Sequence, residues 1–195
     1  MTTPSNDDMS KIPRELKHER QVTLRGYLRS DDLWDIEAKL KDIRTYDSFS
    51  WEKGAIPAGD SIHDIRVCVT VDDTLLVTAA QAFMTAVPYH TCPNALVSIE
   101  AMKGATIGPG WRSAIEERLG GDRGCTHIRE LLLHIATTAY QTIPVWQAQQ
   151  RGDVIQSNDG QPPQHLGRCT TWSFNGPVVA RIYPQFIGWK SPPRR

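Results

Sequence analysis

The sequence lacks an excess of charge of either sign and any long apolar run. Lys and Arg together number 22, as do Asp and Glu, so the formal net charge at pH 7 is zero. A balanced charge argues against a broad nucleic-acid or membrane surface that works through bulk electrostatics. No apolar run approaches the roughly 18 residues that a membrane span requires. We therefore expect neither a nucleic-acid partner nor a membrane partner.

The N-terminal stretch MTTPSNDDMSKIPREL also lacks the apolar core of a signal peptide. We expect a cytoplasmic protein, in which cysteines are thiols rather than disulfides. Cysteine itself is sparse, with Cys68, Cys92, Cys125 and Cys169 making up the whole set. Free thiols suit metal binding or catalysis, and the alternative is that each is a small buried hydrophobe.

Apolar periodicity predicts an α+β fold. Alternation with a period of two predicts antiparallel strands over residues 19–28, 33–41, 63–71 and 75–82. Helical spacing predicts helices over residues 93–103 and 126–142, the second bounded by Pro144, and these should cover one face of the sheet. Composition predicts a loop over residues 46–61. Strands followed by helices favour an antiparallel sheet packed against a helical layer.

The length of 195 residues suits one domain with additional segments. We expect residues 1–13 to be disordered and residues 14–149 to form the α+β core. Residues 150–195 should form a loop and a β-rich aromatic extension packed on the core, with a hairpin around Asn175 and Gly176.

Two predicted helices begin with a thiol. Cys92 and Cys125 stand at helix N-termini, where unpaired N–H groups and a partial positive charge stabilise a thiolate. His63 begins a strand with the parity of its core-facing residues. If both helices pack at that end of the sheet, His63, Cys92 and Cys125 converge and suit zinc or iron. The fourth ligand is left open among His127, Cys169, His90 and water. Buried structural residues are the alternative interpretation.

Two resemblances follow from longer stretches. From GDSIHDIRVCVTVDD through PYHTCP and IGPGW to GCTHIRELLLHIATTAY, the chain resembles an uncharacterised bacterial family of unknown function. In order and spacing it is also similar to the NifU/IscU-type iron–sulfur scaffold. That resemblance implies a NifU/IscU-like core in which His63, Cys92 and Cys125 occupy the ligand positions. The sequence departs from the scaffold, because His63 replaces a cysteine, and Gly124 stands where the scaffold has a histidine.

The altered ligand set favours an enzyme over a cluster carrier. We predict a small metal-dependent lyase that performs retro-aldol or C–O cleavage on an aromatic catabolite, with release of formaldehyde as one form of the reaction. His127 or Asp64 would carry the proton. The predicted partner is a small aromatic molecule, and a homodimer is left open. The alternatives are a non-enzymatic metal or iron–sulfur carrier and a plain interaction domain.

Overall fold

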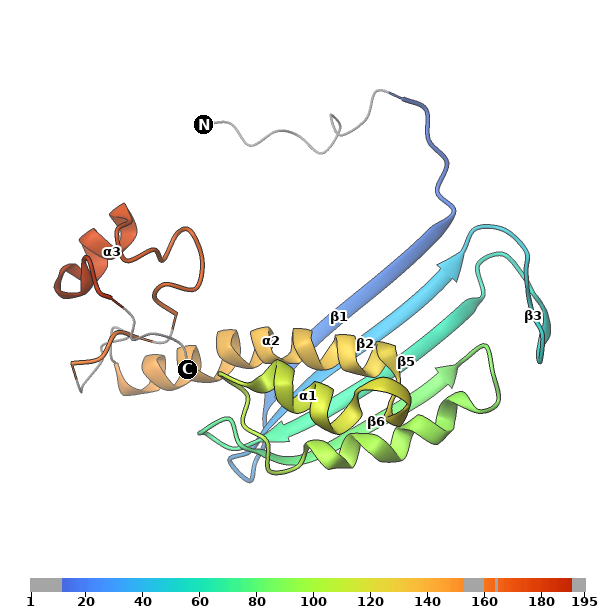
Figure 1. The fold of residues 1–195 in the computed structure, drawn as a ribbon, viewed down its shortest axis with the longest axis horizontal. Coiled ribbons are helices and arrows are strands. Elements are labelled where there is room, and N and C mark those ends of the chain that lie inside the picture. Colours follow the sequence, from blue (N-terminus) through green and yellow to red (C-terminus); the bar gives the residue numbers. More distant parts are fainter. Residues whose placement is uncertain (1–11, 153–159, 164, 191–195) are drawn as a thin grey trace. The chain divides into compact units, whose positions relative to one another are not determined.

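The computed structural model describes residues 12–152, 160–163 and 165–190. A four-stranded antiparallel sheet of order β1-β2-β5-β6 dominates it (Figure 1). The strands are β1 (His18–Leu28), β2 (Trp34–Arg44), β5 (Ser61–Val71) and β6 (Val77–Ala86). The predicted α+β class and antiparallel sheet are confirmed.

The stretch predicted as a loop between β2 and β5 contains a small hairpin. Strands β3 (Ser48–Ser50) and β4 (Gly54–Ile56) pair antiparallel as a separate two-stranded sheet. Gly54 has a φ of 75°, a left-handed backbone that glycine adopts at little steric cost, and it closes the turn. Strands of three residues are too short to show alternation in the sequence, so composition alone pointed to a loop.

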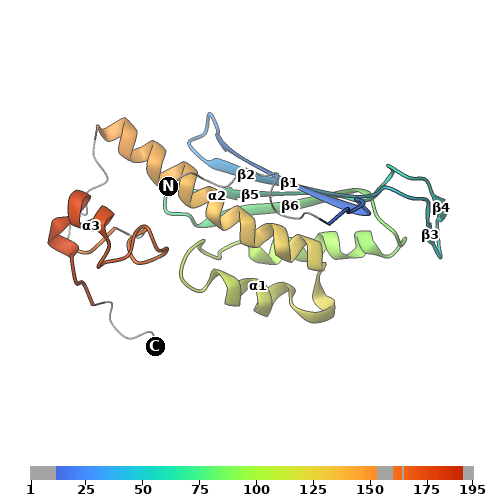
Figure 2. The same cartoon turned by 90° about the horizontal axis from the view of Figure 1, so that it is seen from above.

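Helical segments cover one face of the sheet, as predicted (Figure 2). They are η2 (Cys92–Met102), a 3-10 helix, then α1 (Trp111–Leu119), η3 (Gly121–Arg123) and α2 (Thr126–Arg151). The expectation that Pro144 bounds α2 is wrong, because the helix continues to Arg151. Ile143 and Ala148 on either side of Pro144 are both buried, and this burial supports the continued helix. In the part of the chain that the structure describes, no helix is long and apolar enough to cross a membrane.

The core lies between the sheet and these helices. Its strand residues alternate with the pleat, as in Ile36, Ala38 and Leu40 of β2, and α2 contributes Ile128 and Leu132. These side chains are at most 1% exposed, so little tolerance remains for a change of volume.

Helix α2 approaches β1 closely at one glycine. A Cβ atom on Gly26 would lie 2.7 Å from both Cγ2 and Oγ1 of Thr142. Glycine at this position therefore sets how near α2 lies to the sheet.

Among the described residues up to Ile143, no helix covers the opposite face of the sheet (Figure 2). Lys39, Arg66 and Phe83 are register partners on β2, β5 and β6, and all three have the parity opposite to the core. Phe83 is 56% exposed there.

The chain divides into two compact units, the first ending at Ile143 and the second beginning at Pro144. The second contains α3 (Pro177–Ile182) and η4 (Pro184–Phe186) around a small aromatic core. The predicted β-rich hairpin at Asn175–Gly176 is wrong, since the described residues of this unit carry no strand. Pro177 instead occupies the first turn of α3, where a missing N–H costs nothing. Most of the segment predicted to be disordered lies outside the described residues.

Candidate functional site

Three polar side chains form a row across the sheet at one end. Arg20 of β1 is opposite Asp42 of β2, which is opposite His63 of β5. Asp42 continues the parity of the buried residues of β2 and is itself only 2% exposed. Directly opposed residues in antiparallel strands point to the same face, so all three side chains face the helical layer.

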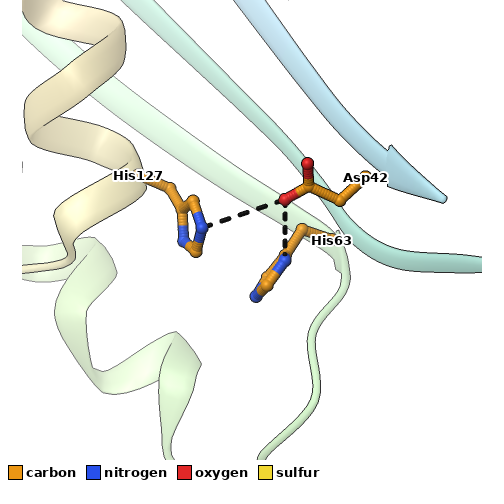
Figure 3. A group of neighbouring side chains, drawn as sticks. All are labelled: Asp42, His63 and His127. Carbon is orange, nitrogen blue, oxygen red and sulfur yellow. Dashed lines mark hydrogen bonds and ion pairs between the residues drawn. The ribbon is translucent and has the colours of Figure 1, made fainter. Parts of the chain in front are cut away.

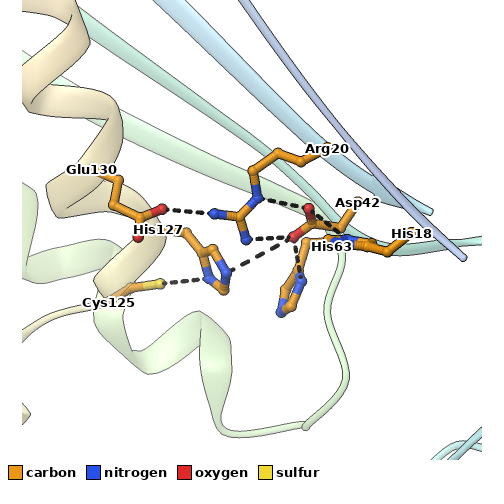
Figure 4. Close-up of polar contacts among 7 residues, drawn as sticks. All are labelled: His18, Arg20, Asp42, His63, Cys125, His127 and Glu130. Atoms are coloured by element: carbon orange, nitrogen blue, oxygen red, sulfur yellow. Dashed lines mark hydrogen bonds and ion pairs between the residues drawn. The ribbon is translucent and has the colours of Figure 1, made fainter. Parts of the chain in front are cut away.

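Asp42 accepts four hydrogen bonds (Figure 4). Arg20 donates from Nε to Oδ1 at 2.8 Å and from its second terminal nitrogen to Oδ2 at 2.9 Å. His18 Nε2 lies 3.2 Å from Oδ1, and His63 Nδ1 lies 3.0 Å from Oδ2. Two carboxylate oxygens offer about four lone-pair positions, so these bonds saturate Asp42.

An ionised carboxylate only accepts hydrogen bonds, and this assigns the tautomer of His63. Nδ1 must carry the proton that is donated to Asp42. In neutral His63 the lone pair is therefore on Nε2, the ring nitrogen that points away from Asp42 (Figure 3). His63 is thus an oriented base.

The start of α2 contributes the other half of the cluster. The His127 ring centroid lies 4.1 Å from that of His63, and its Nε2 lies 3.9 Å from Asp42 Oδ2. Its Nδ1 lies 3.8 Å from Cys125 Sγ (Figure 4). Glu130, one turn further along α2, accepts a 2.9 Å hydrogen bond from Arg20. The guanidinium therefore links the sheet to the helix.

The environment separates the two imidazoles. Burial, followed by the charge of His127, lowers the pKa of His63, and the hydrogen bond to Asp42 only partly offsets this. Contact with the thiol of Cys125 raises the pKa of His127 in spite of its burial. The pKa of His63 is thus lowered and that of His127 is raised. His63 therefore favours the neutral base, and His127 favours the protonated acid.

The acidic groups of the cluster favour their ionised forms. Burial alone raises the pKa of Asp42, but the hydrogen bonds and charge of Arg20, and then those of His63, outweigh it and leave the pKa lowered. Burial also raises the pKa of Cys125, but the hydrogen bond to His127 and the backbone N–H groups at the start of α2 outweigh it. The helix start is therefore one cause of the lowered pKa of Cys125, after the hydrogen bond with His127.

The structure brings together some of the predicted site residues. In the described parts of the chain, the group with one ligand atom from each residue within 4.8 Å is Asp42, His63 and His127. Cys125 lies beside this group, against His127. Cys92 begins η2, is half-buried, and is not a member of the group. The expected cluster of His63, Cys92 and Cys125 is therefore replaced by one of different composition, and the ligand roles themselves stay predictions.

The remaining candidates lie elsewhere. Asp64 has the parity opposite to His63 and forms an ion pair of 3.1 Å with Lys39 on the open face. The carboxylate beside the imidazoles is Asp42, and the proton-carrier role predicted for Asp64 stays a prediction. The backbone N–H of His90 is bonded to Glu52, and Cys169 is exposed in the second unit.

Asp42 and Arg20 were missed from the sequence. Asp42 had a signal, because a carboxylate on the apolar parity of a clearly alternating strand requires a buried partner. No such signal marked Arg20, because its contact with Asp42 depends on the register in which β1 and β2 pair.

Fold and site together define a two-layer α+β domain with an imidazole–carboxylate–thiol cluster at one end of its sheet. The chain belongs to the family described as "Protein of unknown function (DUF2889)", whose model matches residues 18–141. This match confirms the predicted membership of an uncharacterised family and includes every residue of the cluster. No curated protein and no solved structure matches the chain. The likeness to the NifU/IscU-type scaffold stays a prediction.

Proposed function

We propose that this chain is a cytoplasmic lyase that cleaves a C–C bond in a small aromatic substrate by proton transfer, as in a retro-aldol reaction that releases formaldehyde. The observation that supports this most strongly is the pair of imidazoles 4.1 Å apart, one of them held by a saturated carboxylate. Paired titratable groups whose surroundings push their pKa values apart are the usual arrangement for an acid and a base.

The proposed reaction uses the two rings in different roles. Nε2 of His63 takes the proton from the β-hydroxyl group of the substrate. The bond between the α and β carbons breaks, formaldehyde leaves, and the electron pair passes to an enolate. His127 donates a proton to the α carbon of that enolate. Asp42 holds the His63 ring and balances positive charge as His63 becomes protonated.

The second candidate is a metal-dependent form of the same lyase, with zinc or iron. The observation that favours it is that Asp42, His63 and His127 match a two-histidine, one-carboxylate set with ligand atoms within 4.8 Å. The hydrogen bonds of Asp42 oppose it, because all four lone-pair positions of the carboxylate already accept a proton donor. A metal ion at Asp42 would have to displace Arg20 or a histidine, so the arrangement fits proton transfer better.

The test uses 3-hydroxy-1-phenylpropan-1-one, which a retro-aldol reaction converts to acetophenone and formaldehyde. Formaldehyde release should fall by about 100-fold or more in His63→Gln and in His127→Gln, because removal of a general acid or base costs this much. His134→Gln is the matched control, since it changes an exposed histidine on α2 outside the cluster. Activity equal to wild type in both cluster variants would refute the proposal.

Metal analysis of the protein purified without added metal or chelator separates the two forms of the proposal. Full activity with less than about one-tenth of an equivalent of zinc and iron favours proton transfer alone. Stoichiometric metal that is lost in His63→Gln favours the metal-dependent form. Bound metal without lyase activity favours a carrier, and neither metal nor activity favours an interaction domain.

A further inference from the structure

The hairpin β3–β4 is inserted at the end of the sheet that carries the cluster. Strand β2 ends at Arg44, two residues after Asp42, and β5 begins at Ser61, two residues before His63. Residues 48–56 lie between these two strand ends and project beyond the sheet (Figure 1). The two strands that supply the carboxylate and the base therefore also fix the position of this hairpin.

The hairpin exposes large aromatic side chains. Trp51 is 87% exposed and Phe49 is 64% exposed. Their rings pack edge to face, with centroids 5.8 Å apart and planes at 86°. Tyr46, between β2 and β3, and Tyr89, between β6 and η2, are 47% and 43% exposed. A local group of exposed aromatic residues marks a binding surface, because covering it removes apolar area from water.

Side-chain hydrogen bonds hold the hairpin in place. The hydroxyl of Ser50, a residue only 5% exposed, donates to the carbonyl oxygen of Pro88 at 2.6 Å. The backbone N–H of His90 donates to Glu52 Oε2 at 2.6 Å. These bonds tie the hairpin to the segment that leads into η2. The aromatic surface is therefore organised before a ligand arrives, which reduces the entropy lost on binding.

We propose that the hairpin residues Phe49 and Trp51, at the end of the sheet that carries His63 and His127, bind the aromatic ring of the substrate. This inference rests on the proposed lyase function. The turn between the two strands carries Glu52 and Lys53, which have opposite charges, so the surface suits a neutral ring rather than an anion. A perpendicular pair of rings offers one face and one edge, the geometry that a third aromatic ring matches.

Acetophenone is the probe, because it contains the ring and no bond that the retro-aldol reaction breaks. Its binding is measured by saturation-transfer NMR and by titration of the wild-type protein. Trp51→Ala and Phe49→Ala should each weaken binding by about tenfold, in the range of one lost aromatic contact with its buried area. Both side chains are exposed, so circular dichroism and thermal melting should stay as in wild type.

Phe83→Ala is the matched control, since Phe83 is similarly exposed but lies on the opposite face of the sheet. It should bind acetophenone as the wild type does. His63→Gln should also bind acetophenone with wild-type affinity. Loss of activity in His63→Gln therefore tests the proposed lyase function, whereas loss of binding in Trp51→Ala tests the role of the hairpin. Unchanged binding in Trp51→Ala and Phe49→Ala, or no binding to the wild type, would overturn the inference. The first of these results would indicate that the hairpin contacts a macromolecule instead.

Discussion

Replacement of Arg20 by methionine should destabilise the domain through the carboxylate it leaves behind. The Asp42 side chain is 3% exposed and receives two hydrogen bonds from the guanidinium. Loss of one partner of a buried ion pair costs about 3–5 kcal/mol. The Arg20 side chain is 38% exposed, and Asp42 keeps His18 and His63, so we discount the loss to about 2 kcal/mol for solvent screening. For a chain of this size that corresponds to a melting temperature lower by about 4–8 °C.

The matched control is Arg29→Met. Arg29 makes the same two-pronged contact with Asp31, at 2.9 and 2.7 Å, but both side chains are largely exposed, so its loss should change the melting temperature little. The lowered pKa of Asp42 adds a pH signature. A carboxyl group with a depressed pKa stabilises the fold above its unfolded pKa, and this contribution is lost as the pH falls through the folded pKa. The difference in melting temperature between wild type and Arg20→Met should therefore become smaller below about pH 4. The reasoning would be refuted if Arg20→Met and Arg29→Met lowered the melting temperature equally. It would also be refuted if the difference between wild type and Arg20→Met stayed the same from pH 7 to pH 3.

Three further predictions concern packing and thiol reactivity. Gly26→Ala should destabilise the domain by about 1–3 kcal/mol through contact with Thr142, and Thr142→Ala should restore much of the loss in the double variant; additive losses in urea melts would contradict this. Leu132→Ala should cost about 2–5 kcal/mol because the side chain is fully buried, and an unchanged urea midpoint would argue against the described core. Iodoacetamide at pH 8 should alkylate Cys125 faster than Cys68, because burial raises the pKa of Cys68 to about 11. Mass spectrometry of the peptides measures the two rates, and faster alkylation of Cys68 would contradict the prediction.

Long periodic segments were predictable because their pattern repeats the geometry of the fold. The alternating residues of β2 and β5 and the apolar stripe of α2 define which face of each element is buried. The C-terminal unit shows the limit of this reasoning. Its aromatic residues pack as a small cluster around α3, and such a cluster has no period by which the sequence could distinguish a strand from a short helix.

The candidate site was partly predictable for a similar reason. The parity of His63 and the helix start at Cys125 are local properties, and both residues lie in or beside the observed cluster. Cys92 has the same local signal, but η2 starts at a place that does not bring its thiol into the group of ligand atoms. A position at a helix start predicts that a thiol has a lowered pKa. The side chains that surround the thiol depend instead on how helices and strands pack, which the local sequence does not show.

The row of Arg20, Asp42 and His63 also specifies which residues pair when the sheet forms. Nearly all of β1 is exposed, so burial of apolar side chains gives this edge strand only a weak preference for one alignment with β2. A slip of one residue would turn Arg20 to the opposite face and leave Asp42 buried without its guanidinium. The cost of that unpaired charge disfavours the misaligned sheet, so the polar group at the candidate site acts as a selector of the native pairing during folding.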